Sequence, residues 1–205
     1  MLLNKMRPRA QEENKLTERS DTYSIKNKIW LTSKSRMQAE KRYAMYDNVA
    51  HIILCVFSIV LIGIAVFSKN LPDSVPIDAY TIWFSVWVIV FSVVVFGFGF
   101  GKTAVLHREC YIRLQKLHDS RSDVEVIEDT YHDIVSSYPN HSDADFDRLI
   151  LSRTLFHSAG IVDPNGKPLT WNWAMLGKFL ASQILFWLSP ILILVVSVGS
   201  IYWLW

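Results

Sequence analysis

Two apolar runs of about 20 residues set the strongest constraint on this chain. Residues 49–68 and 82–101 contain no Lys, Arg, Asp or Glu, and a short loop with two prolines and two aspartates separates them. A helix that rises about 1.5 Å per residue needs about 20 residues to cross a hydrocarbon core of about 30 Å. Each run therefore predicts a transmembrane helix, and together they predict an antiparallel hairpin of spans.

A third apolar segment, residues 175–205, closes the chain. Within it, Pro190 has no backbone N–H, so the carbonyl near Phe186 loses its helical donor, and the span is predicted to bend. Ser182, Gln183 and Ser189 lie in the same half of this helix. The predicted fold class is an all-α membrane protein: a transmembrane hairpin with long cytoplasmic extensions, a small helical cytoplasmic region and a third, C-terminal transmembrane helix.

The basic residues are distributed unevenly along the chain. Residues 1–48 hold 11 of the 21 Lys and Arg, residues 102–178 hold nine, and the loop 69–81 holds one. Since positive charge beside a span stays on the cytoplasmic side, both basic regions are predicted to be inside and the loop outside. We expect a multi-pass protein of the cell inner membrane with a cytoplasmic N-terminus and an outside C-terminus.

Outside the spans, the residue pattern predicts four parts. Residues 1–24 are polar without apolar periodicity and are expected to form a flexible arm. Residues 25–157 form the main domain, in which a helix leads into the first span and the second span continues as one long helix into the cytoplasm. Further helices are predicted over residues 124–137 and from Ser142, which forms a capping box with Asp145, to about residue 157. Residues 158–174 are a turn-rich connector, and residues 175–205 are the third span.

Small residues mark one side of the second span. Their spacings of four and seven residues would let another helix approach closely. Two uses remain open: packing inside one protomer, or an assembly or pore-lining role. The alternating glycines before Lys102 do not have the spacing or the strand-to-helix context of a phosphate-binding loop. The residues of this stripe are Ser85, Ser92, Gly97, Gly99 and Gly101.

One cluster of His and Asp could hold a metal or serve catalysis. The spacing of its aspartates resembles a calcium loop, but Arg148 and Thr154 stand where such a loop needs Gly and Glu. Two interpretations remain: acids that cap and solvate a helix, or a metal-dependent hydrolase using His132, His141 and Asp145. The first is favoured, so no enzyme activity, metal or cofactor is expected. The cluster contains His132, Asp133, His141, Asp143, Asp145 and Asp147.

Two further features limit the chemistry of the chain. Cys55 and Cys110 are the only cysteines, so no disulfide framework or cysteine zinc site is expected. His51, at the inner edge of the first span, is the only ionisable group expected within the spans. An active transporter is disfavoured because transported-ion and proton sites need polar groups at membrane depth.

Several segments together resemble the SLATT family, the SMODS and SLOG-associating two-transmembrane effector domains. The resemblance covers roughly residues 29–153 and is carried by residues 29–42, the double span, residues 107–117 and residues 131–146. Its most specific residues are Tyr131, Pro139, Asn140, His141 and Asp145. The subfamily associated with reverse transcriptases is one candidate within the family, and the third apolar segment departs from a two-span plan.

The resemblance implies a pore-forming or membrane-disrupting effector of a prokaryotic anti-phage defence system. Such an effector acts as an oligomer and causes abortive infection when a partner sensor triggers it. The implied partners are the chain itself, the bilayer and a co-encoded reverse transcriptase or nucleotide-signalling protein. The alternative is a non-conducting membrane anchor or scaffold for a partner enzyme such as a reverse transcriptase or nucleotidyltransferase. The basic N-terminal arm could also bind nucleic acid directly through its Lys and Arg.

Overall fold

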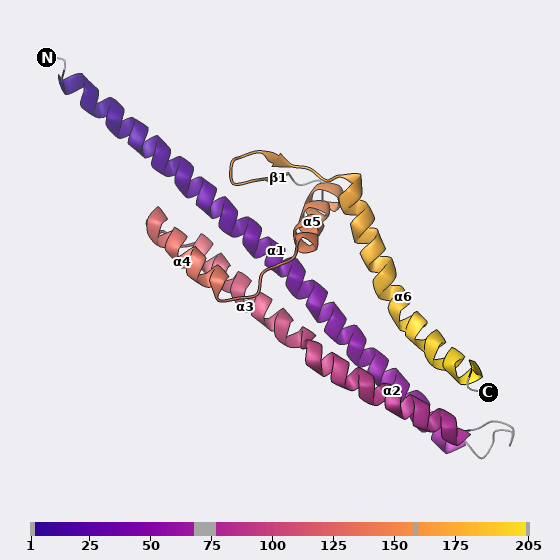
Figure 1. Ribbon diagram of the computed structural model, residues 1–205. Helices are drawn as coiled ribbons and strands as arrows, with labels where there is room; N and C mark the ends of the chain where they lie inside the picture. The colour runs from indigo at the N-terminus through magenta and orange to yellow at the C-terminus, as the bar shows by residue number, and fades with distance from the viewer. Residues whose placement is uncertain (1–2, 68–76, 158–159, 204–205) are drawn as a thin grey trace. The chain divides into compact units, whose positions relative to one another are not determined.

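The computed structural model describes residues 3–67, 77–157 and 160–203, and nearly all of them are helical (Figure 1). The predicted all-α membrane class is confirmed. The predicted turn between the first two spans lies largely outside the described residues. The elements are α1 (Leu3–Phe67), α2 (Ile77–Phe98), α3 (Phe100–His118), α4 (Val124–Ser136), α5 (Asp143–Leu151), the π-helical turn η2 (Ser152–Phe156), β1 (Ile161–Val162), β2 (Pro168–Leu169) and α6 (Trp173–Trp203).

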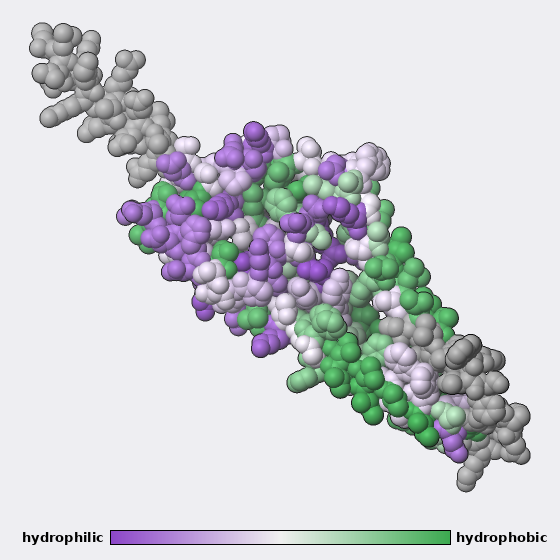
Figure 2. Space-filling model, viewed as in Figure 1, coloured by the Kyte–Doolittle hydropathy of each residue, from purple (hydrophilic) through white to green (hydrophobic). Residues whose placement is uncertain are grey.

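The chain divides into two compact units, and α1, α3 and α6 each contribute to both. The polar unit comprises residues 1–41 and 104–179, and the span unit comprises residues 42–103 and 180–205. Figure 2 shows mostly hydrophilic colour over the polar unit and mostly hydrophobic colour over the span unit. Three helices, within residues 19–67, 77–118 and 173–192, are long and apolar enough to cross a membrane. All three predicted spans therefore have a helical counterpart.

Helix α1 starts much earlier than predicted. It begins at Leu3 rather than at Ile25, so residues 3–24 are helical, and the flexibility of this arm stays a prediction. The first 24 residues contain no glycine and many strong helix formers, including Gln, Glu, Lys, Leu and Arg. Once a helix exists, each added residue gains one backbone hydrogen bond, so propensity extends it where no apolar stripe is present.

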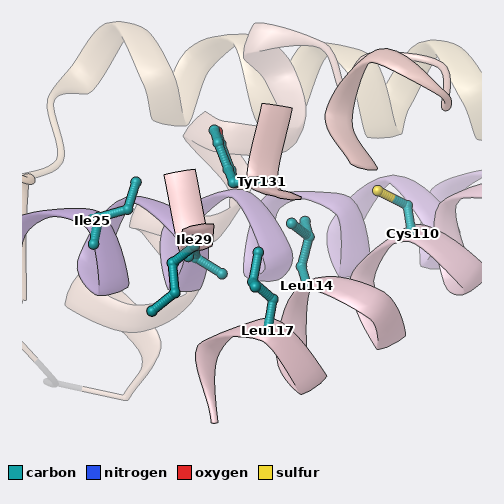
Figure 3. Packing of buried hydrophobic residues seen from close by; sticks show 7 residues of the cluster. Ile25, Ile29, Cys110, Leu114, Leu117 and Tyr131 are labelled. Atoms are coloured by element: carbon teal, nitrogen blue, oxygen red, sulfur yellow. The ribbon is translucent and has the colours of Figure 1, made fainter. Parts of the chain in front are cut away.

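Stripes from three helices form the main core of the polar unit (Figure 3). Each stripe follows the three- and four-residue spacing that places side chains on one helix face. The α1 and α4 stripes are pairs four residues apart, and the α3 stripe continues the apolar pattern beyond the second span. The buried residues are Ile25 and Ile29 of α1, Cys110, Leu114 and Leu117 of α3, and Ile127 and Tyr131 of α4.

A short hairpin completes the polar unit. Strands β1 and β2 pair antiparallel, Ile161 opposite Leu169, around a turn in which Gly166 has φ +81°. The turn lies in the connector that the sequence predicts to be rich in turns. Asn27 of α1 donates its amide to the carbonyls of Val162 and Asp163, at 3.1 and 2.7 Å. The hairpin is therefore fastened to α1 by hydrogen bonds as well as by burial of Ile161.

In the span unit, α1 and α2 run antiparallel and pack through aromatic side chains. The Phe57 ring lies 6.5 Å from that of Phe84 and 6.1 Å from that of Phe91, between ring centres. Helix α6 contacts α1 where Phe186 stacks on Tyr46 at 4.9 Å. These contacts are consistent with the predicted transmembrane hairpin and join the third helix to it.

The second span does not continue as the single uninterrupted helix predicted from sequence. Gly99 has φ +54° and separates α2 from α3. The hydrogen-bond ladder still crosses the break, from Gly99 N–H to Val95 O at 3.4 Å and from Thr103 N–H to Gly99 O at 3.0 Å. Glycine adopts a positive φ at no steric cost, whereas other L-residues do not. The break is thus confined to the backbone conformation of one residue, Gly99.

We expect Gly99→Ala to destabilise the protein by about 1–2 kcal/mol, the usual cost of a left-handed conformation in an L-residue. The added Cβ itself meets only Lys102 Cβ, at 3.9 Å, so the cost arises in the backbone. Gly97→Ala is the matched control, because Gly97 has open space around it and a helical φ. Denaturant unfolding of the detergent-solubilised protein, followed by circular dichroism, measures both. Equal stability of the two variants would contradict the prediction.

Candidate functional site

A buried arginine joins α1 to the loop between α4 and α5. Arg36 is 0% exposed, and its Nη1 donates to Pro139 O at 2.7 Å. Within the described part of the chain, its Nε and Nη2 have no hydrogen-bond partner. An unpaired buried charge costs several kcal/mol, so burial of Arg36 is not explained by stability alone. We call Arg36 with Pro139, His141, Asp145 and Cys110 the Arg36 cluster.

The loop itself is held by hydrogen bonds at the start of α5. The Ser142 N–H and hydroxyl both donate to Asp145 Oδ2, at 3.0 and 2.8 Å, and His141 N–H donates to Asn140 Oδ1 at 2.9 Å. The predicted capping box is therefore confirmed. Asp145 is 1% exposed, and its negative charge at a helix N-terminus is favoured by the helix dipole.

Tyr131 brings α4 to the same stretch of α1. Its hydroxyl lies 3.1 Å from Thr32 Oγ1, and Lys28 Nζ lies 4.9 Å from its ring centre. Two of the predicted family-motif residues, Tyr131 and Pro139, thus contact α1 between Lys28 and Arg36 directly. Asn140 and His141 lie with Pro139 in the loop that Arg36 binds, and Asp145 lies in the first turn of α5.

Sequence reasoning did not single out Arg36 as a site residue, although it carried a signal. Arg36 occupies the apolar register that begins at Ile25 and Ile29, where a charged side chain must be buried or must disrupt packing. A charge in such a register is the pattern that indicates a buried polar contact. The motif residues that bind it were predicted, so one half of the contact was identified from sequence.

Burial keeps two titratable side chains of the Arg36 cluster neutral. The pKa of His141 is lowered by burial and then by the Arg36 charge, which together outweigh Asp145 and Asp143. Burial raises the pKa of the Cys110 thiol, against the opposing effects of Arg36 and Arg113. A buried thiol with a raised pKa is a poor nucleophile, so Cys110 has a packing role.

Arg36→Met should loosen the loop more than it changes global stability. Methionine fills similar space and removes a buried charge, so unfolding should change by no more than about 1 kcal/mol, while the Pro139 anchor is lost. We expect faster backbone amide exchange over residues 137–142, measured by hydrogen–deuterium exchange. Arg113→Met is the matched control: Arg113 is exposed and contacts the same loop only through the Tyr138 ring, at 5.5 Å. Equal exchange in both variants would contradict the anchoring role.

Stability of the polar unit should fall as pH falls below about 6.5, the ordinary pKa of an imidazole. Because the pKa of His141 is lowered in the folded state, the unfolded chain binds its proton first. The resulting loss of folding stability is absent well above the ordinary imidazole pKa and is complete only below the lowered pKa of His141 in the folded state. His141→Gln should lose less stability than wild type between pH 7 and 5, and the exposed His132→Gln should follow wild type. Matching slopes for all three proteins in denaturant unfolding would disprove the linkage.

The structure does not bring His132 together with His141 and Asp145, the residues of the hydrolase alternative that the sequence disfavoured. His132 is exposed, with its Nε2 3.9 Å from Glu128 Oε1, and it is not part of the Arg36 cluster. Among the described residues, no group of three or more His, Cys, Asp or Glu is placed to hold a metal ion. Cys55 is exposed and Cys110 buried, and both are free thiols.

The small-residue stripe of the second span has two different environments. Gly101 lies against α1, where an added Cβ would be 3.0 Å from an Asp47 carboxylate oxygen, and its N–H donates to Asp47 Oδ1 at 3.0 Å. A Cβ added at Gly97 would meet no other part of the chain within 4 Å, and Ser92 is exposed. The stripe therefore supports a contact within the chain at one end and presents an open surface further along.

The serine hydroxyls of the stripe bond within their own helix. Ser85 Oγ donates to Thr81 O, and Ser92 Oγ donates to Val88 O, each at 2.7 Å. Neither hydroxyl hydrogen therefore needs a partner on another helix or a bound ion.

Asp47 is a functional candidate that sequence reasoning missed. The break at Gly99 creates a new helix start at Phe100, and the Asp47 carboxylate accepts one of the N–H groups exposed there. His51, one turn along α1, has its Nδ1 2.8 Å from the Asp47 carbonyl oxygen. The available signal was that Asp47 is the last acid before an uncharged span.

The environment of Pro190 agrees with its predicted role in part. Pro190 lies inside α6, and Ser189 Oγ donates to Phe186 O at 2.8 Å. This carbonyl is the one that the proline deprives of its helical N–H donor. The predicted approach of Ser189 is confirmed, and the bend stays a prediction.

These features define a helical membrane protein in which a hairpin of spans is joined to a polar helical unit. The chain matches the model of the SMODS and SLOG-associating 2TM effector domain family 5 over residues 18–203, and it belongs to this SLATT family. The resemblance predicted from sequence is confirmed. The family is one of membrane effector domains in defence systems, and it is not a known family of enzymes.

The family match is wider than the predicted one of residues 29–153. It includes the whole of α6, so the third apolar helix lies inside the family model. No curated protein and no solved structure matches the chain.

Proposed function

We propose that the protein is an oligomeric, pore-forming or membrane-disrupting effector of a prokaryotic anti-phage defence system. A co-encoded sensor or enzyme, such as a reverse transcriptase or nucleotide-signalling protein, triggers it, and opening of the membrane causes abortive infection. Membership in an effector family with long apolar helices supports this function. We further propose location in the cell inner membrane, with the N-terminus in the cytoplasm and the C-terminus outside, from the distribution of Lys and Arg.

The main support for the proposal is that few residues of the span unit are buried within one copy of the chain. Among its residues with described side chains, only Phe57 and Phe84 are buried. Three helices with so small an interior cannot enclose a path for water and ions within one copy. A conduit therefore requires several copies, arranged most simply as a closed ring.

The open part of the small-residue stripe is the proposed contact between copies. Gly97 and Ser92 lie on exposed parts of α2, and nothing in the described chain fills the space at Gly97. In a membrane, small side chains let two helices approach closely and gain van der Waals contact. The opposite end of the stripe, at Gly101, is already occupied by Asp47.

Gly97→Leu should abolish the loss of membrane potential that follows expression of the wild-type protein in bacteria. A Cβ added at Gly97 has no other part of the chain within 4 Å, so the larger side chain should obstruct mainly the contact between copies. Gly63→Leu is the matched control, because Gly63 is a second open glycine, located on α1 and outside the stripe. A voltage-sensitive dye, read after brief induction at matched expression, gives the potential. Depolarisation by Gly97→Leu as strong as by wild type would rule out a pore built on this stripe.

The polar unit favours one alternative, a non-conducting anchor or scaffold. This unit has its own hydrophobic core, so it could recruit a partner enzyme without any conduit. An unchanged potential with wild type, together with co-purification of the co-encoded partner, would favour this alternative. Direct binding of nucleic acid by the basic N-terminal segment, which α1 renders helical, remains a further proposal about the partner.

A further inference from the structure

The span unit contains an apolar groove of about 270 Å³ bordered by all three spans. We propose that this groove binds one acyl chain of an anionic phospholipid, whose phosphate is held by Arg42. Lipid binding in this groove does not require the protein to conduct ions. The lining residues are Tyr46, Val49, Ala50, Ile53, Phe91, Val94, Val95, Phe98, Phe100, Phe186 and Ser189.

The walls of the groove suit a hydrocarbon chain. Apart from the Tyr46 and Ser189 hydroxyls, every lining side chain is apolar, and Ser189 Oγ already donates to Phe186 O at 2.8 Å. From Tyr46 to Ile53 the α1 wall is about 10 Å long at 1.5 Å per residue. One leaflet contributes about 15 Å of hydrocarbon, so an acyl chain in the groove would follow most of its leaflet.

An aromatic rim closes the Tyr46 end of the groove. The Tyr46 ring lies 4.9 Å from that of Phe186 and 5.8 Å from that of Phe100, between ring centres. Phe98 stacks on Phe100 at 5.2 Å. Amphipathic aromatic rings are enriched at the level of lipid headgroups, so this end corresponds to the membrane–water boundary.

One cation lies beside this rim. The Arg42 guanidinium carbon is 5.9 Å from the Tyr46 ring centre and 4.6 Å from the Tyr43 ring centre. The nearby Asp47 carboxylate is directed to Gly101 N–H at 3.0 Å. Basic residues between spans at the headgroup level bind phosphate groups of lipids.

The test uses the full-length protein in nanodiscs of equal parts phosphatidylglycerol and phosphatidylethanolamine. After release in mild detergent, native mass spectrometry counts the lipids that remain bound. We expect wild type to retain one phosphatidylglycerol per chain in preference to phosphatidylethanolamine. Arg42→Gln should reduce this preference about 5-fold, the size expected for one basic residue near an anionic headgroup. Ala50→Trp should remove retained lipid of both kinds by filling the groove.

Matched controls separate the site from general effects. Lys178→Gln removes one exposed cation elsewhere, and Ile59→Trp places the same indole side chain at an exposed position of α1. Circular dichroism confirms that each variant is folded. Equal retention of the two lipids by wild type, or equal retention by Ala50→Trp and Ile59→Trp, would overturn the proposal. Lipid-free dimers would overturn it in favour of a second copy. Because retention is measured without conduction, failure of the pore proposal leaves this result unaffected.

Discussion

A backbone N–H or C=O without a partner in hydrocarbon costs several kcal/mol, and this cost governs the span unit. Helices satisfy these groups internally, so the three apolar segments are helical. The ladder is disturbed at two described places, and each is repaired by a side chain. Asp47 accepts the Gly101 N–H beside the break at Gly99, and Ser189 donates to the Phe186 carbonyl that Pro190 leaves without its donor. Irregular backbone is thus retained only where a polar group meets it.

The polar unit follows the opposite rule, because one polar group there is buried without full compensation. Its helices pack through apolar stripes in the ordinary way, yet Arg36 makes one backbone contact and leaves two nitrogens unpaired among the described residues. The loop that Arg36 holds contains three of the five motif residues. The motif residue Pro139 is thus the backbone partner of a charge whose burial lowers stability.

The sequence predicted the parts of this protein that composition determines. Uncharged runs of membrane length gave the spans, and regular apolar spacing gave the helices around Ile29, Leu114 and Ile127, because burial follows from residue type and period. The capping box of Asp145 was also legible, since it depends on neighbouring residues. Contacts between distant segments could not be predicted, because they depend on which helices meet. Examples are the contacts of Arg36 with Pro139 and of Asp47 with Gly101. The break at Gly99 was missed because a glycine-rich helix end permits both a straight and a broken backbone.

The left-handed backbone at Gly99 also limits how this position can change over generations. Asparagine and aspartate are the residues other than glycine that adopt such a conformation most readily. No single-base change converts a glycine codon to one for asparagine, and the accessible aspartate would place a carboxylate at the edge of an apolar span, where charge is costly. Every one-step mutation at Gly99 therefore meets either backbone strain or charge burial, so genetic drift at this codon should be slow.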